Sequence, residues 1–330
     1  MARCIHKDCK EQALSLSDYC FRHIKDKNAY IEVLGDYIKT SRSIGFYLRH
    51  LEFPQAKWHN IDVEETDLAG ADLSHADLTA ANFKKANLTG ANLKKADLAS
   101  VDFDEAHLLR CDLSETRLWH CQIKNSNLAE SDLEGADCLK TTFSNVRFWH
   151  VKLNGAKLIT QHSFIGKKPI DEHGALSASE AYRNLKQYFM ASGRYDDASW
   201  ASFKEKILER RYLFENRKFA YVPSLLMSLL CGYGEKPYRV IVSAMGIIFG
   251  YSFVYYALNI LKLPADYYDA TLHFWDYLYF SIVTFTTVGF GDLSPKLIPA
   301  FQMLVGSEAF CGAFMIGLFV FTLTRKYTAR

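Results

Sequence analysis

The sequence predicts a multi-domain membrane protein in which a repetitive soluble coil and a helical hairpin precede an α-helical region with two membrane spans. Apolar residues recur at every fifth position from Val63 to Leu158. Residues 240–261 contain no charge, and residues 298–324 contain one. Because about 20 apolar residues cross a bilayer, both runs are long enough to span it. Between the repeat and the spans, Gly193 separates two segments with helical periodicity.

The composition excludes several classes of protein. The 330 residues carry a net charge of +2, which favours neither an acidic tail nor a polybasic arm, so no nucleic-acid partner is expected. Apolar residues make up 49% of the chain, too many for a disordered protein. Eight cysteines are too few for a disulfide scaffold. The charged N-terminus lacks the apolar core of a signal peptide, so we expect it in the cytosol with reduced thiols.

The repeat has a period that fits neither a helix nor a strand. Its central position is apolar at all 20 steps, and the residue two places earlier is small or β-branched at every step. The residue between them is usually Asp or Asn. Helices repeat every 3.6 residues and strands every 2. A period of five instead fits a coil with flat sides, each of which turns one large and one small side chain inward.

This stretch, with units such as Ala71-Asp72-Leu73, resembles the pentapeptide-repeat family. The resemblance implies a right-handed, four-sided β-helix with four repeats per coil, and therefore about five coils spaced by roughly 4.8 Å. A rigid spacer is the favoured role. Some family members mimic DNA. Residues 61–160 contain 16 acidic and 11 basic residues, and this acidic excess is too small for DNA mimicry.

A repeat coil needs a cap at each end, because an open end pairs with other chains. Residues 28–52 are expected to form a helix that caps the N-terminal end. Downstream, Ser177 and Glu180 have the spacing of a capping box at the start of a helical hairpin. Gly193 is expected to end the first helix, and Asp196 or Asp197 to cap the second.

Charges around the spans predict their orientation. Lys236 and Arg239 precede the first span, and Arg325 and Lys326 follow the second. Basic residues concentrate on the cytoplasmic side, so both termini are expected in the cytoplasm. The segment before the first span is expected to lie along the membrane as an interfacial helix. The predicted location is the cell membrane, the inner or plasma membrane of a prokaryote.

The segment between the spans, FWDYLYFSIVTFTTVGFGD at 274–292, resembles the pore helix and selectivity filter of potassium channels. The resemblance implies that backbone carbonyls of the filter replace the hydration shell of K⁺. Gly289 and Gly291 would permit the left-handed backbone that this requires. One chain supplies one filter strand, so a homotetramer is implied. The filter residues are Thr287, Val288, Gly289, Phe290 and Gly291.

Neighbouring residues are expected to support the filter. The resemblance places Thr286 before it and Asp292 at its outer mouth, with Tyr279 packed behind it. Phe290 stands where many relatives have Tyr, so one hydroxyl is missing. The aromatic residues expected to wedge the filter from behind are Trp275, Tyr277, Tyr279 and Phe280.

Two residues of the second span are gating candidates. Gly312 lies where the inner helix of related channels bends, although close helix packing is the alternative. Glu308 lies one turn earlier, and an acid inside a membrane indicates function. Its side chain either faces the central cavity or packs against the pore helix with hydrogen bonds there.

Cysteines near the N-terminus have metal-ligand spacing. Cys4, Cys9, Cys20 and His23 form C-x4-C-x10-C-x2-H, a ligand set suited to structural Zn²⁺. His6 is an alternative fourth ligand. Free thiols or a redox sensor are the alternatives to zinc. The segment is too short for its own core, so a metal would supply folding energy.

The predicted function is a potassium-selective channel that conducts K⁺ passively, gated from its N-terminal side. A weakly selective cation channel and a membrane-tethered binding scaffold are the alternatives. No enzyme is expected, since no nucleophile–base pair or phosphate-binding loop is evident. The partner of the β-helix is unknown.

The sequence divides into six expected parts. They are a zinc knuckle at 1–27, a helical cap at 28–60, the β-helix at 61–160, a loop and hairpin at 161–216, an interfacial helix and turn at 217–237, and the pore domain at 238–330. Within the pore domain, the spans are expected at about 240–261 and 298–324, the pore helix at about 272–286 and the filter at 287–291.

Overall fold

The computed structural model describes residues 3–6, 12–17, 19–20, 22–40, 45–165, 174–262 and 271–328. The chain divides into two compact units, Met1–Tyr212 and Leu213–Arg330.

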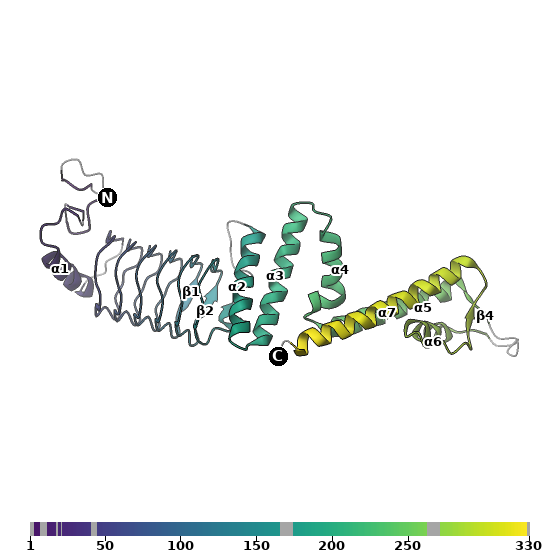
Figure 1. Ribbon diagram of the computed structural model, residues 1–330. Helices are drawn as coiled ribbons and strands as arrows, with labels where there is room; N and C mark the ends of the chain where they lie inside the picture. The colour runs from purple at the N-terminus through teal and green to yellow at the C-terminus, as the bar shows by residue number, and fades with distance from the viewer. Residues whose placement is uncertain are drawn as a thin grey trace. The chain divides into compact units, whose positions relative to one another are not determined.

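The first unit is built around a coil that rises by one turn every twenty residues (Figure 1). Parallel bridges join residues twenty apart, from Tyr47↔Asp67 to Asp137↔Lys157. Each turn therefore contains four five-residue repeats. Where the pairing is longer, it forms a small parallel sheet of β1 (Gln122–Lys124), β2 (Thr142–Ser144) and β3 (Phe164–Ile165).

Turn geometry explains why Asp and Asn precede the central residue. The Asp72 carboxylate accepts a hydrogen bond from the Ser74 amide, at 2.9 Å, and the same bond recurs along the coil. Such side-chain bonds mimic a backbone turn. Asn also donates to the coil before it, as from Asn82 to Asp62 at 2.9 Å. The side chain at the polar position therefore stabilises the corner that follows it and links the coils.

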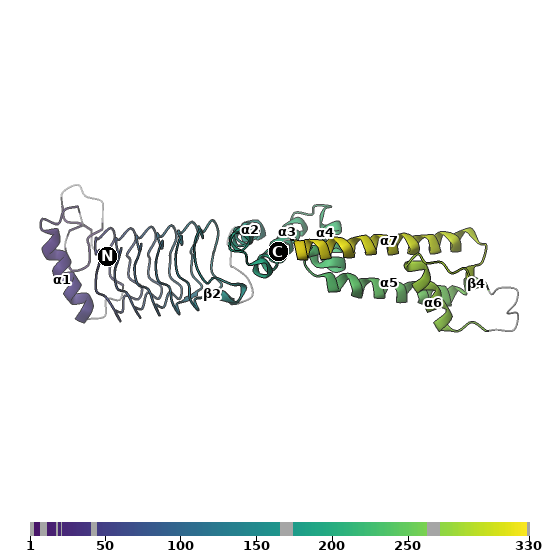
Figure 2. The same cartoon turned by 60° about the horizontal axis from the view of Figure 1, so that its bottom comes forward.

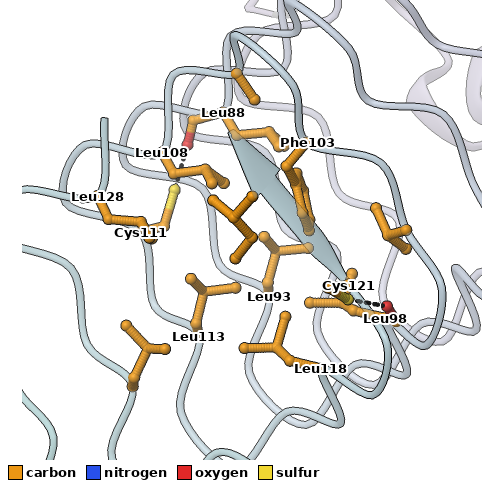
Figure 3. Packing of buried hydrophobic residues seen from close by; sticks show 14 of the residues in the cluster. Leu88, Leu93, Leu98, Phe103, Leu108, Cys111, Leu113, Leu118, Cys121 and Leu128 are labelled. Carbon is orange, nitrogen blue, oxygen red and sulfur yellow. Dashed lines mark hydrogen bonds between the residues drawn. The ribbon is translucent and has the colours of Figure 1, made fainter. Parts of the chain in front are cut away.

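The residue two places before the central one also forms hydrogen bonds between coils where its side chain is polar (Figure 3). The thiols of Cys111 and Cys121 donate to the carbonyls of Leu88 and Leu98, at 2.7 and 2.8 Å. Burial raises the pKa of both thiols to about 12, so they stay protonated. These cysteines pack in the core, and they also join neighbouring coils.

Replacing Phe103 by alanine should lower the free energy of unfolding of the first unit by about 3–5 kcal/mol. Phe103 is fully buried and its ring stacks on Phe83, with centroids 5.6 Å apart. The truncation would leave a cavity between coils that the ladder prevents from closing. Urea denaturation of the purified protein measures the loss. A change below 1 kcal/mol would mean that the coils are not closely packed.

The N-terminal end differs from the prediction. Helix α1 covers Lys27–Thr40, and the coil begins at residue 45, so the expected helix at 28–52 is too long. Leu48, Phe53 and Trp58 are buried at the central position of three earlier repeats. Phe46 and Leu51 occupy the position two places before the central residue, where the later repeats have small or β-branched residues, and so concealed the period. Helix α1 still caps the coil, because its buried side chains join the same core.

A helical hairpin covers the other end of the coil (Figure 1). It consists of α2 (Ala175–Ala191) and α3 (Tyr195–Glu215), and follows the short helix η1 (Gln161–Ser163). The Tyr188 hydroxyl donates to the Ala156 carbonyl at 2.9 Å, and Asp197 accepts from the Gln161 amide at 3.0 Å. The hairpin therefore acts as the second cap.

Three local predictions at this end are wrong. Helix α3 begins at Tyr195, so Asp196 and Asp197 lie inside its first turn and not at its cap. Leu158 is 44% exposed, because the chain leaves the coil at this residue with a left-handed φ of 62°. The helix starts at Ala175 rather than at a capping box of Ser177 and Glu180. Glu180 instead accepts a hydrogen bond from the Trp149 indole at 2.9 Å, which holds α2 against the coil.

The described residues of the second unit form four α-helices, a short 3-10 helix and a two-stranded sheet (Figure 2). Helices α5 and α7 are long and apolar enough to cross a membrane, and α6 packs against both. The elements are α4 (Tyr221–Cys231), η2 (Gly232–Gly234), α5 (Pro237–Leu258), β4 (Leu261–Lys262), α6 (Phe274–Phe285), β5 (Ser294–Pro295) and α7 (Pro299–Thr328). Strands β4 and β5 pair antiparallel.

Candidate functional site

The predicted filter directly follows the C-terminal end of α6. The Thr286 hydroxyl donates to the Ile282 carbonyl at 2.7 Å, and the Val288 amide donates to the Val283 carbonyl at 3.1 Å. The last turn of α6 therefore holds the first residues of the filter segment. Any displacement of this turn also displaces the filter.

The backbone of the segment alternates between two conformations. Thr287, Gly289 and Gly291 have φ values of 57°, 58° and 81°. Val288 and Phe290 lie outside the left-handed region, and their side chains are 56% and 69% exposed. Left-handed residues therefore alternate with residues of negative φ along the segment. Sequence reasoning assigned this conformation to the glycines and missed Thr287, a β-branched residue for which it is a strained outlier.

The aromatic residues of α6 divide between two faces. Trp275 and Tyr279 are 72% and 39% exposed, and the Tyr279 side chain hydrogen-bonds that of Asp292. Tyr277 and Phe280 are buried on the opposite face. The expectation that all four wedge the filter is therefore wrong for Tyr277 and Phe280, because helical spacing carries them toward α5.

Tyr277 and Phe280 belong to a cluster beside the end of α5. Their neighbours include Tyr255 and Ile260. The Tyr277 hydroxyl donates to the Asn259 side chain at 2.7 Å. This cluster anchors the start of α6 on α5.

Glu308 packs against α6, the second of the two placements considered. Its Oε2 accepts a hydrogen bond from the Tyr255 hydroxyl at 2.6 Å, and its Oε1 accepts from the Ser281 hydroxyl. The carboxyl is fully buried. Within a single chain, this acid therefore joins α7 to α5 and α6.

Gly312 lies where α7 meets the last residue of α6. A Cβ built on Gly312 would overlap the carbonyl oxygen of Phe285 and lie 2.7 Å from its carbonyl carbon. Helix α7 is continuous from Pro299 to Thr328. The structure thus gives Gly312 a packing role, and the hinge remains a hypothesis.

Helix α4 contacts the start of α5 and the C-terminal part of α7. Met227 and Leu230 of α4 pack in a cluster that includes Val240 and Leu318. The Arg239 guanidinium donates to the Ser228 carbonyl at 2.9 Å, which ties α4 to the start of α5. The outer face of α4 is apolar and exposed, at Val222, Leu226 and Leu229.

Three of the four predicted metal ligands converge in the first unit. The Sγ atoms of Cys4 and Cys20 lie 3.5 and 3.2 Å from Nδ1 of His23. All three ligand atoms lie within 4.8 Å of one another. Cys9 lies outside the described residues. The ring of His6 stacks on that of His23, with centroids 3.8 Å apart, so His6 also lies beside the cluster.

The chemistry of this cluster fits a structural metal. Burial raises the pKa of the Cys4 thiol, but hydrogen bonds from the backbones of Cys20 and His6 and from the His23 side chain outweigh it and lower the pKa to about 6. Thiolate is the form that binds Zn²⁺. Two sulfurs and one imidazole are three of the four ligands that a tetrahedral zinc site requires.

Comparison with protein families finds matches in two separate parts of the chain. Residues 241–329 match the model of the ion channel family. Matches to pentapeptide repeats, in 8 copies, extend from residue 59 to residue 158. The chain joins pentapeptide repeats to a two-span ion-channel domain. With its two long apolar helices, it is a membrane protein.

Among solved structures, the similarity lies with pentapeptide repeat proteins. Rfr23 from the cyanobacterium Cyanothece is 19% identical over 43% of this chain and 95% of its own, with a TM-score of 0.23. A thylakoid-lumen protein from Arabidopsis thaliana is 25% identical over 35% of this chain and 72% of its own, with a TM-score of 0.22. No curated protein matches the chain.

Proposed function

We propose that the chain is one subunit of a homotetrameric potassium-selective channel. The proposal rests above all on the TVGFG segment, which follows a short helix between two potential spans and has alternating left-handed residues at Thr287, Gly289 and Gly291. Helix α6 is then a re-entrant pore helix. Carbonyls of residues 287–291 replace the hydration shell of K⁺, and the Thr287 hydroxyl adds the innermost ligand.

Exposure of the filter segment supports assembly. Val288 and Phe290 are apolar, and more than half of each side chain is exposed in the single chain. A carbonyl ring around an ion requires several copies, and potassium filters use four strands. Packing four segments around an axis would bury these side chains behind the filter.

Measurement of the mass in detergent tests the assembly. The protein–detergent complex should contain the protein mass of four 37.7 kDa chains, as measured by light scattering with a correction for detergent. A stable dimer would provide only two filter strands and would contradict the proposal.

Both termini are proposed to lie in the cytoplasm of a prokaryotic cell membrane, with α4 along its inner surface. The exposed apolar face of α4 suits the lipid interface, while its other face contacts α7 at Leu318. The first unit, a right-handed four-sided β-helix with two caps, would then act on the gate through α4. The hairpin is fastened to the last coil, and the boundary between the two units falls within the last turn of α3, at Tyr212 and Leu213.

Deleting residues 1–212 should leave a tetrameric, potassium-selective pore with an altered open probability. A cut at residue 165 would expose the apolar face of the hairpin, whereas a cut at the boundary between the units leaves the second unit whole. Single-channel recording in planar bilayers measures the open probability. An unchanged value across ligands and voltages would mean that the first unit does not control the gate.

The cluster of Cys4, Cys20 and His23, with Cys9, is proposed to bind one structural Zn²⁺. Purified protein should contain about one zinc per chain by mass spectrometry, and Cys20→Ser should lose it. Cys231→Ser is a matched control, because that thiol is buried in the second unit far along the sequence. Full zinc content in Cys20→Ser and Cys9→Ser would rule out the site.

A further inference from the structure

A buried hydrogen-bond cluster, which we name the pore-helix seat, joins three helices through Tyr255 of α5, Ser281 of α6 and Glu308 of α7. All three side chains have no exposed surface. Each carboxyl oxygen of Glu308 has one hydroxyl partner. A carboxyl in apolar surroundings is stable only when its oxygens are satisfied. The single chain therefore contains a complete polar cluster within the membrane domain.

The seat lies one helical turn from a second contact between the same helices. Ser281 and Phe285 are four residues apart on α6, and Glu308 and Gly312 are four residues apart on α7. Residues at this spacing share one face of a helix. Ser281 meets Glu308, and the Phe285 carbonyl meets Gly312. Helix α7 therefore holds α6 at two successive turns, and the second turn directly precedes the filter.

We infer that Glu308 is a positioning residue for the selectivity filter. Its two oxygens fix the depth and the rotation of α6 between α5 and α7, and so determine where Thr287 and the residues after it lie. The consequence for ion selection rests on the proposed function, but the fixing of α6 does not. The role depends on hydrogen bonds and not on the charge of the carboxylate.

Two substitutions of Glu308 separate a role in hydrogen bonding from a role of the carboxylate charge. The Ser281 hydroxyl lies within reach of Glu308 and also 2.9 Å from the Ile248 carbonyl. In Glu308→Gln, the side-chain carbonyl can accept from Tyr255, and the amide can donate to Ser281, whose own hydrogen then turns to Ile248. Glutamine therefore replaces every bond without a charge. In Glu308→Ala, both hydroxyls lose their partner on α7.

The test compares potassium flux and the K⁺/Na⁺ permeability ratio of the full-length protein in liposomes. Glu308→Ala should lower the flux at least tenfold and reduce the ratio, Tyr255→Phe should have an intermediate effect, and Glu308→Gln should stay within twofold of wild type. Tyr251→Phe is the matched control and should behave as wild type. It removes a hydroxyl one turn earlier on α5, which lies 2.9 Å from Ser307 of α7 and bonds no residue of α6.

Amide hydrogen exchange of residues 283–288 in lipid nanodiscs provides a second readout that requires no ion flux. Glu308→Ala should speed exchange at least tenfold, while Glu308→Gln and Tyr251→Phe leave it unchanged. Wild-type exchange and selectivity in Glu308→Ala would overturn the inference. Equal damage in Glu308→Gln and Glu308→Ala would do so as well, by assigning the role to charge. If wild type passes no potassium, the proposed function fails, and the exchange rates alone decide the seat.

Discussion

Replacing Gly312 by alanine should abolish potassium flux. The added Cβ would overlap the Phe285 carbonyl at the end of α6. Neither partner can yield cheaply, because the carbonyl belongs to the backbone of α6 and the Cβ is bonded directly to that of α7. Overpacking of this kind costs about 1–3 kcal/mol or more in each chain. The helices must separate, and the filter that follows Phe285 moves with α6. We expect at least a tenfold loss of flux in liposomes.

The matched control for this substitution is Gly306→Ala in the same helix. A Cβ on Gly306 has no heavy atom within 4 Å, and its φ is not in the left-handed region. Alanine is favoured over glycine in a helix by about 1 kcal/mol, so this variant should be at least as stable as wild type. If Gly312→Ala conducts as well as Gly306→Ala, the close contact between α7 and α6 is not required for the filter.

Replacing Gly289 by alanine should also abolish flux, for a different reason. No neighbour in the chain would clash with the new Cβ, but the φ of Gly289 is 58°. A left-handed conformation costs an L-residue about 1–2 kcal/mol, and the four chains of a tetramer would bear it at one level of the filter. The backbone should relax toward negative φ and turn its carbonyl away from the axis.

Assembly should survive this change, because Gly289 lies outside the helices that hold the fold. The variant should therefore have the mass of the wild-type tetramer but lack potassium flux. Gly246→Ala in α5, where the φ is ordinary and the space is open, should keep both. Selective flux through Gly289→Ala would contradict the assignment of residues 287–291 as the filter.

The repeat shows which parts of a fold a sequence can predict. One strict period identified the coil, because the same inward position recurs in every repeat. The start of the coil was missed, since Phe46 and Leu51 occupy the position that holds a small or β-branched residue in the later repeats. The hairpin was found from its helical pattern. Its position as a cap depends on contacts such as that between Tyr188 and Ala156, which no local pattern encodes.

The candidate site divides in the same way. The TVGFG motif is local, so its residues could be named from the sequence. The orientation of Glu308 could not, because its partners Tyr255 and Ser281 lie 53 and 27 residues away in the chain. The division of α6 into two faces could have been found from helical spacing, since Trp275 and Tyr279 are one turn apart. Which face meets α5 follows only from packing.

The reversal potential under bi-ionic conditions tests the central claim most directly. Purified protein in a planar bilayer would face K⁺ on one side and Na⁺ on the other at equal concentration. A potassium-selective filter built from residues 287–291 predicts a reversal potential displaced far toward that of K⁺, and Gly289→Ala should carry no such current. A reversal potential near zero would identify a weakly selective cation channel, and the absence of current would favour a membrane-tethered scaffold. Either result would contradict the proposed function.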